Sequence, residues 1–73
     1  MRVHVTLRGA IAGDSQPQHR ISVQLPWGST VEYLIGHLSI ASADVQMALV
    51  NGSPAVRSAV LNNGDRVILA AAS

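Results

Sequence analysis

Residues 50–69 of this chain read VNGSPAVRSAVLNNGDRVIL. Two turn signals interrupt the apolar positions, Asn51-Gly52 and, ten residues later, Asn62-Asn63-Gly64-Asp65. Asn and Gly tolerate the left-handed backbone that tight turns require, so each signal marks a chain reversal. The pattern predicts one strand before Asn51, over residues 45–50, and a last strand over residues 66–70, in which Val67 and Leu69 are in phase.

The residues upstream predict two more strands and a helix. Apolar and polar residues alternate over 2–8 and again over 20–25, which is typical of strands with one buried face. They are expected to pair antiparallel across a loop, residues 9–18, that holds Gly13-Asp14-Ser15 and Pro17. A helix is expected over 31–38, because its apolar residues recur at helical spacing: Val31, Leu34, Ile35 and Leu38. Ser29 and Glu32, three apart, are a capping-box signature at its start.

The segment 45–50 is apolar at nearly every position. Such continuity indicates a strand buried on both faces. The pattern leaves open which pair faces the helix, Met47 with Leu49 or Ala48 with Val50. After the Asn51-Gly52 turn, residues 55–60 are weakly patterned, and we expect a short edge strand and a helical turn there.

The predicted order is strand, strand, helix, strand, short strand, strand, in a single domain spanning residues 1–73. One helix on one face of a mixed sheet of four to five strands is a two-layer α+β design.

Composition narrows the function classes. The 73 residues include no cysteine, so disulfides, a thiol nucleophile and cysteine zinc sites are excluded. The net charge is +1, lysine is absent, and the five arginines are dispersed without interleaved aromatics, so nucleic-acid binding is not expected. The N-terminus has no apolar signal region, and no apolar run approaches the ~20 residues that span a membrane. We expect a cytoplasmic protein, and the low charged content of 12% favours one that covers part of its surface with a partner.

Three motifs together resemble a known family. They are Gly28-x-Thr30-Val31 at the helix start, Val50-Asn51-Gly52, and Gly64-Asp65-x-Val67 about a dozen residues later. This spacing resembles the sulfur-carrier proteins of the MoaD/ThiS type, in the ubiquitin-like β-grasp superfamily. The resemblance covers most of the chain. It implies a β-grasp fold in which the first and last strands pair in parallel at the centre of the sheet.

The resemblance also frames the chemistry of the tail. In the family, an E1-like enzyme adenylates a C-terminal Gly-Gly, which then becomes a thiocarboxylate. Here Leu69 is followed by Ala70-Ala71-Ala72-Ser73, and each of these residues adds a Cβ that glycine lacks. We therefore expect a non-catalytic protein-interaction module or subunit that is not conjugated. Its partner would be an E1-like adenylyltransferase or a larger enzyme subunit.

The alternative is a genuine sulfur carrier in molybdopterin or thiamin-type biosynthesis, thiocarboxylated at its C-terminus. It requires a natural chain that continues past Ser73 or a dedicated partner that accepts this end. A third class, a nucleic-acid or ribosome-associated domain, predicts salt-dependent RNA binding. The oligomeric state is not predicted.

The expected partner-binding residues come from two places. Ile68 is out of phase with Val67 and Leu69, so it belongs on the sheet face away from the helix, where proteins of the MoaD/ThiS type dock partners. Trp27, in a Pro-Trp-Gly loop, has two interpretations: a cover for one end of the core, or an exposed anchor of the kind enriched in interfaces. The complete predicted set is Trp27, Arg66, Ile68, Ala70, Ala71, Ala72 and Ser73.

No other residues predict chemistry. The histidines His4, His19 and His37 lack the spacing of metal ligands, and we interpret them as surface residues, with His37 beside Tyr33 on the helix. The aspartates Asp14, Asp44 and Asp65 have the context of turn or cap residues. We expect no enzyme activity, cofactor or metal.

Overall fold

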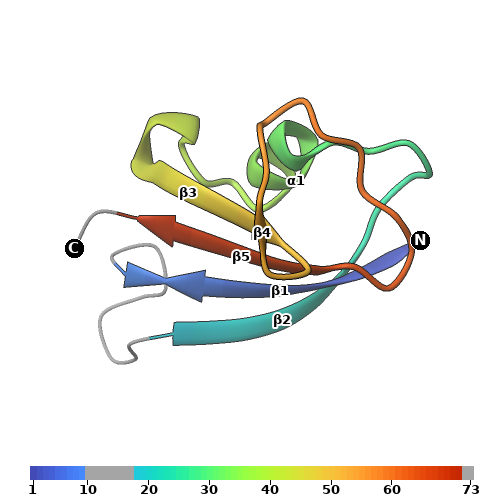
Figure 1. Cartoon of the computed structure of the whole chain (residues 1–73), viewed down its shortest axis with the longest axis horizontal. Helices are drawn as coiled ribbons and strands as arrows, with labels where there is room; N and C mark the ends of the chain where they lie inside the picture. The colour runs from blue at the N-terminus through green and yellow to red at the C-terminus, as the bar shows by residue number, and fades with distance from the viewer. Residues whose placement is uncertain (10–17, 72–73) are drawn as a thin grey trace.

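Five strands form one mixed sheet in the order β2-β1-β5-β3-β4 (Figure 1). The computed structural model describes residues 1–9 and 18–71, so the predicted loop at Gly13-Asp14-Ser15 and Pro17 lies outside the described residues. The elements are β1 (Arg2–Arg8), β2 (Gln18–Gln24), α1 (Val31–His37), the 3-10 helix η2 (Ser42–Asp44), β3 (Val45–Val50), β4 (Ser53–Pro54) and β5 (Arg66–Ala71).

The strands at the two ends of the chain lie together at the centre of the sheet. β1 and β5 pair in parallel, with Val5 opposite Val67 and Leu7 opposite Leu69. β1 pairs antiparallel with β2, and β3 pairs antiparallel with both β5 and β4. This topology confirms the predicted mixed sheet and its parallel central pair. Figure 1 shows α1 on one side of the sheet only.

The two turn motifs of residues 50–69 are bonded to each other. Asn51 and Gly52 have φ of 53° and 85°, and they form the two-residue hairpin loop between Val50 and Ser53. The Asn51 amide nitrogen Nδ2 donates to Asp65 Oδ1 at 3.0 Å, while Asn51 Oδ1 accepts from the Arg66 amide at 3.0 Å. Asp65 is only 7% exposed, and its other carboxylate oxygen accepts from the Asn62 amide at 2.7 Å. Asp65 is thus a turn residue, as predicted, and it ties both turns together.

The edge strand is shorter and earlier than predicted. β4 comprises only Ser53 and Pro54, and residues 55–60 form no strand or helix beyond a single bridge between Thr30 and Val60. This segment runs along the start of α1 instead. The Arg57 and Ala59 carbonyls accept hydrogen bonds from the Glu32 and Val31 amides, at 2.9 and 3.0 Å. Bonding to the otherwise unpaired amides of a helix N-terminus replaces strand pairing here.

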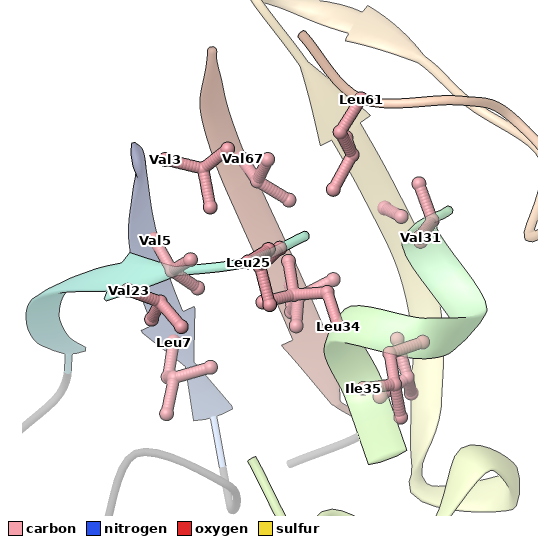
Figure 2. Packing of buried hydrophobic residues seen from close by; sticks show 13 residues of the cluster. Val3, Val5, Leu7, Val23, Leu25, Val31, Leu34, Ile35, Leu61 and Val67 are labelled. Carbon is pink, nitrogen blue, oxygen red and sulfur yellow. The ribbon is translucent and has the colours of Figure 1, made fainter. Parts of the chain in front are cut away.

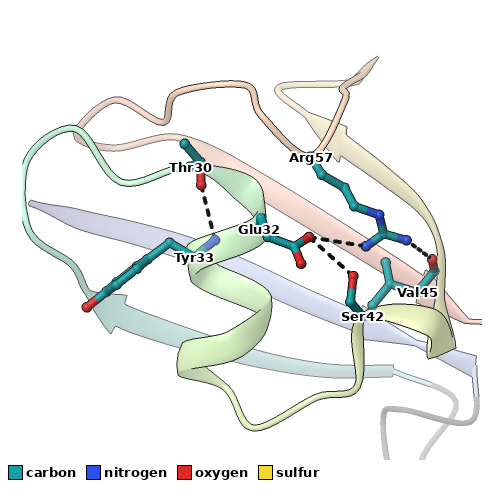
Figure 3. Close-up of polar contacts among 6 residues, drawn as sticks. All are labelled: Thr30, Glu32, Tyr33, Ser42, Val45 and Arg57. Carbon is teal, nitrogen blue, oxygen red and sulfur yellow. Dashed lines mark hydrogen bonds and ion pairs between the residues drawn. The ribbon is translucent and has the colours of Figure 1, made fainter.

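The helix cap also differs from the prediction. The N-cap is Thr30, whose hydroxyl accepts from the Tyr33 amide at 3.1 Å (Figure 3). Ser29 turns away and donates its hydroxyl to the Pro26 carbonyl at 2.6 Å. Glu32 accepts from the Ser42 hydroxyl at 3.2 Å and lies 3.8 Å from an Arg57 guanidinium nitrogen. The predicted Ser29–Glu32 capping box is therefore wrong, because Glu32 contacts η2 and the 55–60 segment.

The core lies between α1 and one face of the sheet (Figure 2). Its buried side chains are Val3, Val5, Leu7, Val23, Leu25, Val31, Leu34, Ile35, Val45, Ala48, Leu61, Val67 and Leu69. On β3, Ala48 and the partly buried Val50 face the helix, which answers the question that the sequence left open. Met47 is 53% exposed on the other face, so the prediction that β3 is buried on both faces is wrong.

Candidate functional site

The sheet face away from α1 is built by the residues that alternate with the core positions. We call this surface the outer face. Strand register places its side chains in four rows across the sheet. The rows are Gln24-Arg2, Ser22-His4-Arg66, Arg20-Thr6-Ile68-Leu49-Pro54, and Arg8-Ala70-Met47. Because neighbouring strands lie about 4.8 Å apart, side chains within a row are immediate neighbours.

The half of the outer face over β5 and β3 is apolar. Ile68 lies directly opposite Leu49, and Ala70 lies opposite Met47. Ile68, Leu49 and Ala70 are partly exposed, and Met47 is 53% exposed. A hollow of about 250 Å³ lies at the edge of β3, and its lining includes Met47 and Val56. Val56 is 69% exposed, so the apolar surface extends from Met47 to this residue. Clustering of exposed apolar side chains, rather than any one of them, distinguishes a binding surface from ordinary exposure.

The half over β1 and β2 is polar and cationic. A depression of about 380 Å³ crosses it, lined by His4, Thr6, Arg20, Arg66, Val67 and Ile68. The His4 ring nitrogen Nδ1 lies 3.2 Å from the Ser22 hydroxyl, across the β1–β2 pair. The depression thus has arginines on its cationic side and Ile68 on its apolar side, which suits a partner that presents both carboxylate and apolar groups.

The predicted site residues do not form a single cluster. Arg66, Ile68 and Ala70 lie together on the outer face. Ala71 pairs with the buried Val45 and is on the helix side, while Ala72 and Ser73 lie outside the described residues.

Trp27 belongs to the opposite end of the sheet. Trp27 comes two residues after Leu25, whose amide donates to the Met1 carbonyl at 2.8 Å, next to the start of β1. β5 runs parallel to β1 and ends beside the other end of that strand, where Arg8 pairs with Ala70. Figure 1 shows the N-terminus and the end of β5 at opposite ends of the molecule. Trp27 is 75% exposed, so the interpretation that it covers the core is wrong.

The other candidate residues are dispersed. His4 is exposed on the outer face, His19 is exposed on β2, and the His37 ring stacks on Tyr33 with centroids 6.2 Å apart. Asp44 ends η2. Within residues 1–9 and 18–71, no three metal-ligating side chains converge. In the same part of the chain, no helix has the length and apolar character that a bilayer crossing demands.

The predicted site residues did not include Arg8, Arg20, Met47 or Leu49, and the structure places these side chains on the outer face. A signal for the arginines was available, since Arg8 shares the phase of Arg2 and His4 along an alternating strand, and Arg20 alternates with Ile21 and Val23. The phase of β3 was hidden, because both of its faces are apolar.

The sequence matches no family model and no curated protein. Among solved structures, it is similar to the crystal structure of SAMP1 from Haloferax volcanii, with a TM-score of 0.71 and 19% identity. The match covers 100% of this chain and 97% of that one. The fold is a ubiquitin-like β-grasp. At this identity the likeness establishes the β-grasp architecture, and function must be argued from the surface.

Proposed function

We propose that this chain is a small β-grasp module of the MoaD/ThiS type that works by binding a protein partner through its outer face, without catalysis and without conjugation. The observation that carries the proposal is the exposed apolar cluster at Ile68, Leu49, Met47 and Ala70. These four residues belong to two adjacent strands in register, on the face that α1 leaves uncovered.

The cluster departs from the alternation of apolar and polar residues that β1 and β2 follow. The alternation of β1 and β2 sends polar residues outward, at Arg2, His4 and Ser22. On β3 and β5 the alternation is broken, and both faces are apolar. Apolar outer positions on adjacent central strands contribute little to the fold, since nothing in the described chain covers them. A protein that covers them on binding gives them a role.

Substitution of Ile68 tests the proposal directly. The partner is first isolated from the native host with wild-type protein as bait and identified by mass spectrometry; its affinity is then measured with purified components. Ile68→Asp is expected to weaken binding at least tenfold, because it places a charge in the desolvated centre of the interface. Ser58→Asp, at an exposed position in the 55–60 segment, is the matched control and should bind like the wild type. Equal affinities for both variants would refute the outer face as the docking site.

The absence of conjugation has its own test. The purified protein is incubated with the E1-like enzyme of its host in a pyrophosphate-exchange assay, and no adenylation is expected. Exchange above the enzyme-alone background would favour the sulfur-carrier function instead. A carrier isolated from its host would also show the mass change of one oxygen replaced by sulfur, whereas the proposed module retains its unmodified mass.

A further inference from the structure

Four arginines that are dispersed along the sequence share one face of the sheet in the fold. Arg2 and Arg8 are on β1, Arg20 is on β2 and Arg66 is on β5, and strand register puts all four on the outer face. Each is exposed. The fifth, Arg57, is committed elsewhere, since it donates to the Val45 carbonyl at 2.6 Å and lies beside Glu32 (Figure 3).

The acidic side chains of the described residues lie off this face. Glu32 is on α1, Asp44 is in η2 beside it, and Asp65 is buried between the two turns. Asp14 falls in the segment 10–17, outside the described residues. Within residues 1–9 and 18–71, none of the four outer-face arginines is within ion-pair distance of a carboxylate. A chain with a net charge of only +1 therefore concentrates positive charge on the face that carries the apolar cluster.

We propose that the outer face recognises an acidic protein segment with an apolar centre. Carboxylates would lie against Arg8 and Arg20 on β1 and β2 and against Arg66 at the start of β5, and apolar side chains over Ile68 and Leu49. The guanidinium group suits this role because its planar fork pairs with both oxygens of a carboxylate. This inference rests on the proposed function and adds the chemistry of the partner.

The composition of the face favours a protein over a nucleic acid. Single-stranded nucleic acids are bound by cationic grooves that also present aromatic platforms for base stacking. The aromatic residues of this chain are Trp27, in the loop after β2, and Tyr33, on α1, and neither belongs to the outer face. Phosphate binding would leave the apolar half uncovered, whereas an acidic segment with apolar residues uses both halves.

The test uses a defined probe, the peptide Glu-Glu-Leu-Leu-Glu-Glu with both ends blocked, added to isotope-labelled protein and followed by NMR. We expect weak saturable shifts at the amides of Thr6, Ile68 and Leu49, and an affinity that falls as salt is raised. The same peptide with lysine for glutamate, and the one with serine for leucine, should both bind at least threefold more weakly. An oligouridylate with the same net charge as the glutamate peptide is titrated in the same way, to compare binding of a nucleic acid with binding of the peptide.

Two matched variants test whether positive charge on the outer face, and not the net charge of the protein, determines the affinity for the peptide. Arg20→Gln and Ser58→Glu each lower the net charge by one, on the outer face and off it. Arg20→Gln should weaken the glutamate peptide about threefold, as expected for an exposed ion pair, and Arg20→Lys should restore part of the loss. Ser58→Glu should leave the affinity unchanged. Equal effects of the two variants would overturn the proposal, as would equal binding of the lysine peptide, no shifts with any peptide, or tighter binding of the oligouridylate at the same amides.

Failure here is distinguishable from failure of the proposed function. If Ile68→Asp weakens the host partner while Arg20→Gln changes neither its affinity nor its salt dependence, the docking site stands and its acidic specificity is refuted. If neither substitution affects the host partner, both proposals fail together.

Discussion

The two faces of the same sheet differ in what their residues do. The face under α1 buries side chains from every major strand, and Val3 and Leu69 have no exposed surface at all. The outer face keeps arginines and a half-exposed methionine in solvent. Both faces belong to the same sheet, so their difference reflects side-chain choice and not backbone geometry. The inner face makes the fold, and we expect the outer face to be dispensable for it.

The contrast is sharpest on β3. Its inner residues Val45 and Ala48 are buried, while its outer residues Met47 and Leu49 are as apolar as a core residue and yet reach solvent. Folding does not require apolar residues at those two positions, since polar residues occupy the equivalent positions on β1. The side chains of β3 therefore suggest selection for something besides stability.

The largest expected effect comes from creating a cavity in the core between α1 and the inner face of the sheet. Leu34 lies on α1 with 0% of its surface exposed. Leu34→Ala should cost about 2–5 kcal/mol, the transfer energy of the lost methyl groups plus that of the cavity they leave. A domain of this size has only about 4–11 kcal/mol of stability, so this variant is expected to lose a large share of it. Urea denaturation followed by circular dichroism measures the loss.

The outer-face counterpart is Ile68→Ala, which removes apolar atoms from a partly exposed side chain. Its expected cost is below about 1 kcal/mol, because no cavity forms and little area returns to water. If Ile68→Ala destabilised the fold as much as Leu34→Ala, the division between a structural and a binding face would be wrong.

The next effect concerns the two bonded turns, Asn51-Gly52 between β3 and β4 and residues 62–65 before β5. Asp65→Ala leaves the Asn62 amide and the Asn51 side-chain amide without their shared acceptor. Both hydrogen bonds are partly buried, and a hydrogen bond to a charged group contributes about 1.5–3 kcal/mol, so a loss in that range is expected in the same urea assay. Asp44→Ala, an exposed aspartate in η2, is the control and should change stability by less than about 0.5 kcal/mol. Comparable losses in both variants would argue against the bonded pair of turns.

Much of this architecture was predictable from local patterns. Alternation located β1 and β2, helical spacing located α1, and the Asn51-Gly52 pair located the hairpin, because each signal arises within a few neighbouring residues. The parallel pairing of β1 with β5 joins residues about sixty positions apart. Only the family resemblance suggested it, since periodicity carries no information about which strands are neighbours.

The errors have a common physical cause. The N-cap is Thr30 and not Ser29, and residues 55–60 are not a strand, because contacts between distant segments decide both. Likewise the arginines are dispersed in sequence, at 2, 8, 20 and 66, and they share one face only after β1, β2 and β5 align. The sequence thus predicted Ile68 and Arg66 for the outer face but missed Arg8, Arg20, Met47 and Leu49.

A smaller effect tests the corrected cap. Thr30→Ala removes the hydroxyl that accepts from the Tyr33 amide, and loss of an N-cap costs about 1 kcal/mol. Glu32→Ala removes the side chain that a capping box would need, and it should cost less, since Glu32 pairs with Arg57 at an exposed site. Thermal unfolding of the two variants ranks them. A larger loss for Glu32→Ala than for Thr30→Ala would restore the capping box.

The smallest expected effect separates the faces most cleanly. Arg66→Gln removes one of four like charges that the sheet holds on neighbouring strands, opposite His4 and next to the row of Arg20. Because the side chain is exposed and its loss relieves repulsion between cations, stability should change by no more than about 0.5 kcal/mol, and in the stabilising direction at low salt. Urea midpoints at low and high salt measure this, and the difference between wild type and variant should shrink as salt rises. A residue that lowers the stability of the fold and is nevertheless present has a role other than folding. If Arg66→Gln both stabilises the protein and weakens binding of the acidic peptide, the role of Arg66 is to bind a partner at the outer face.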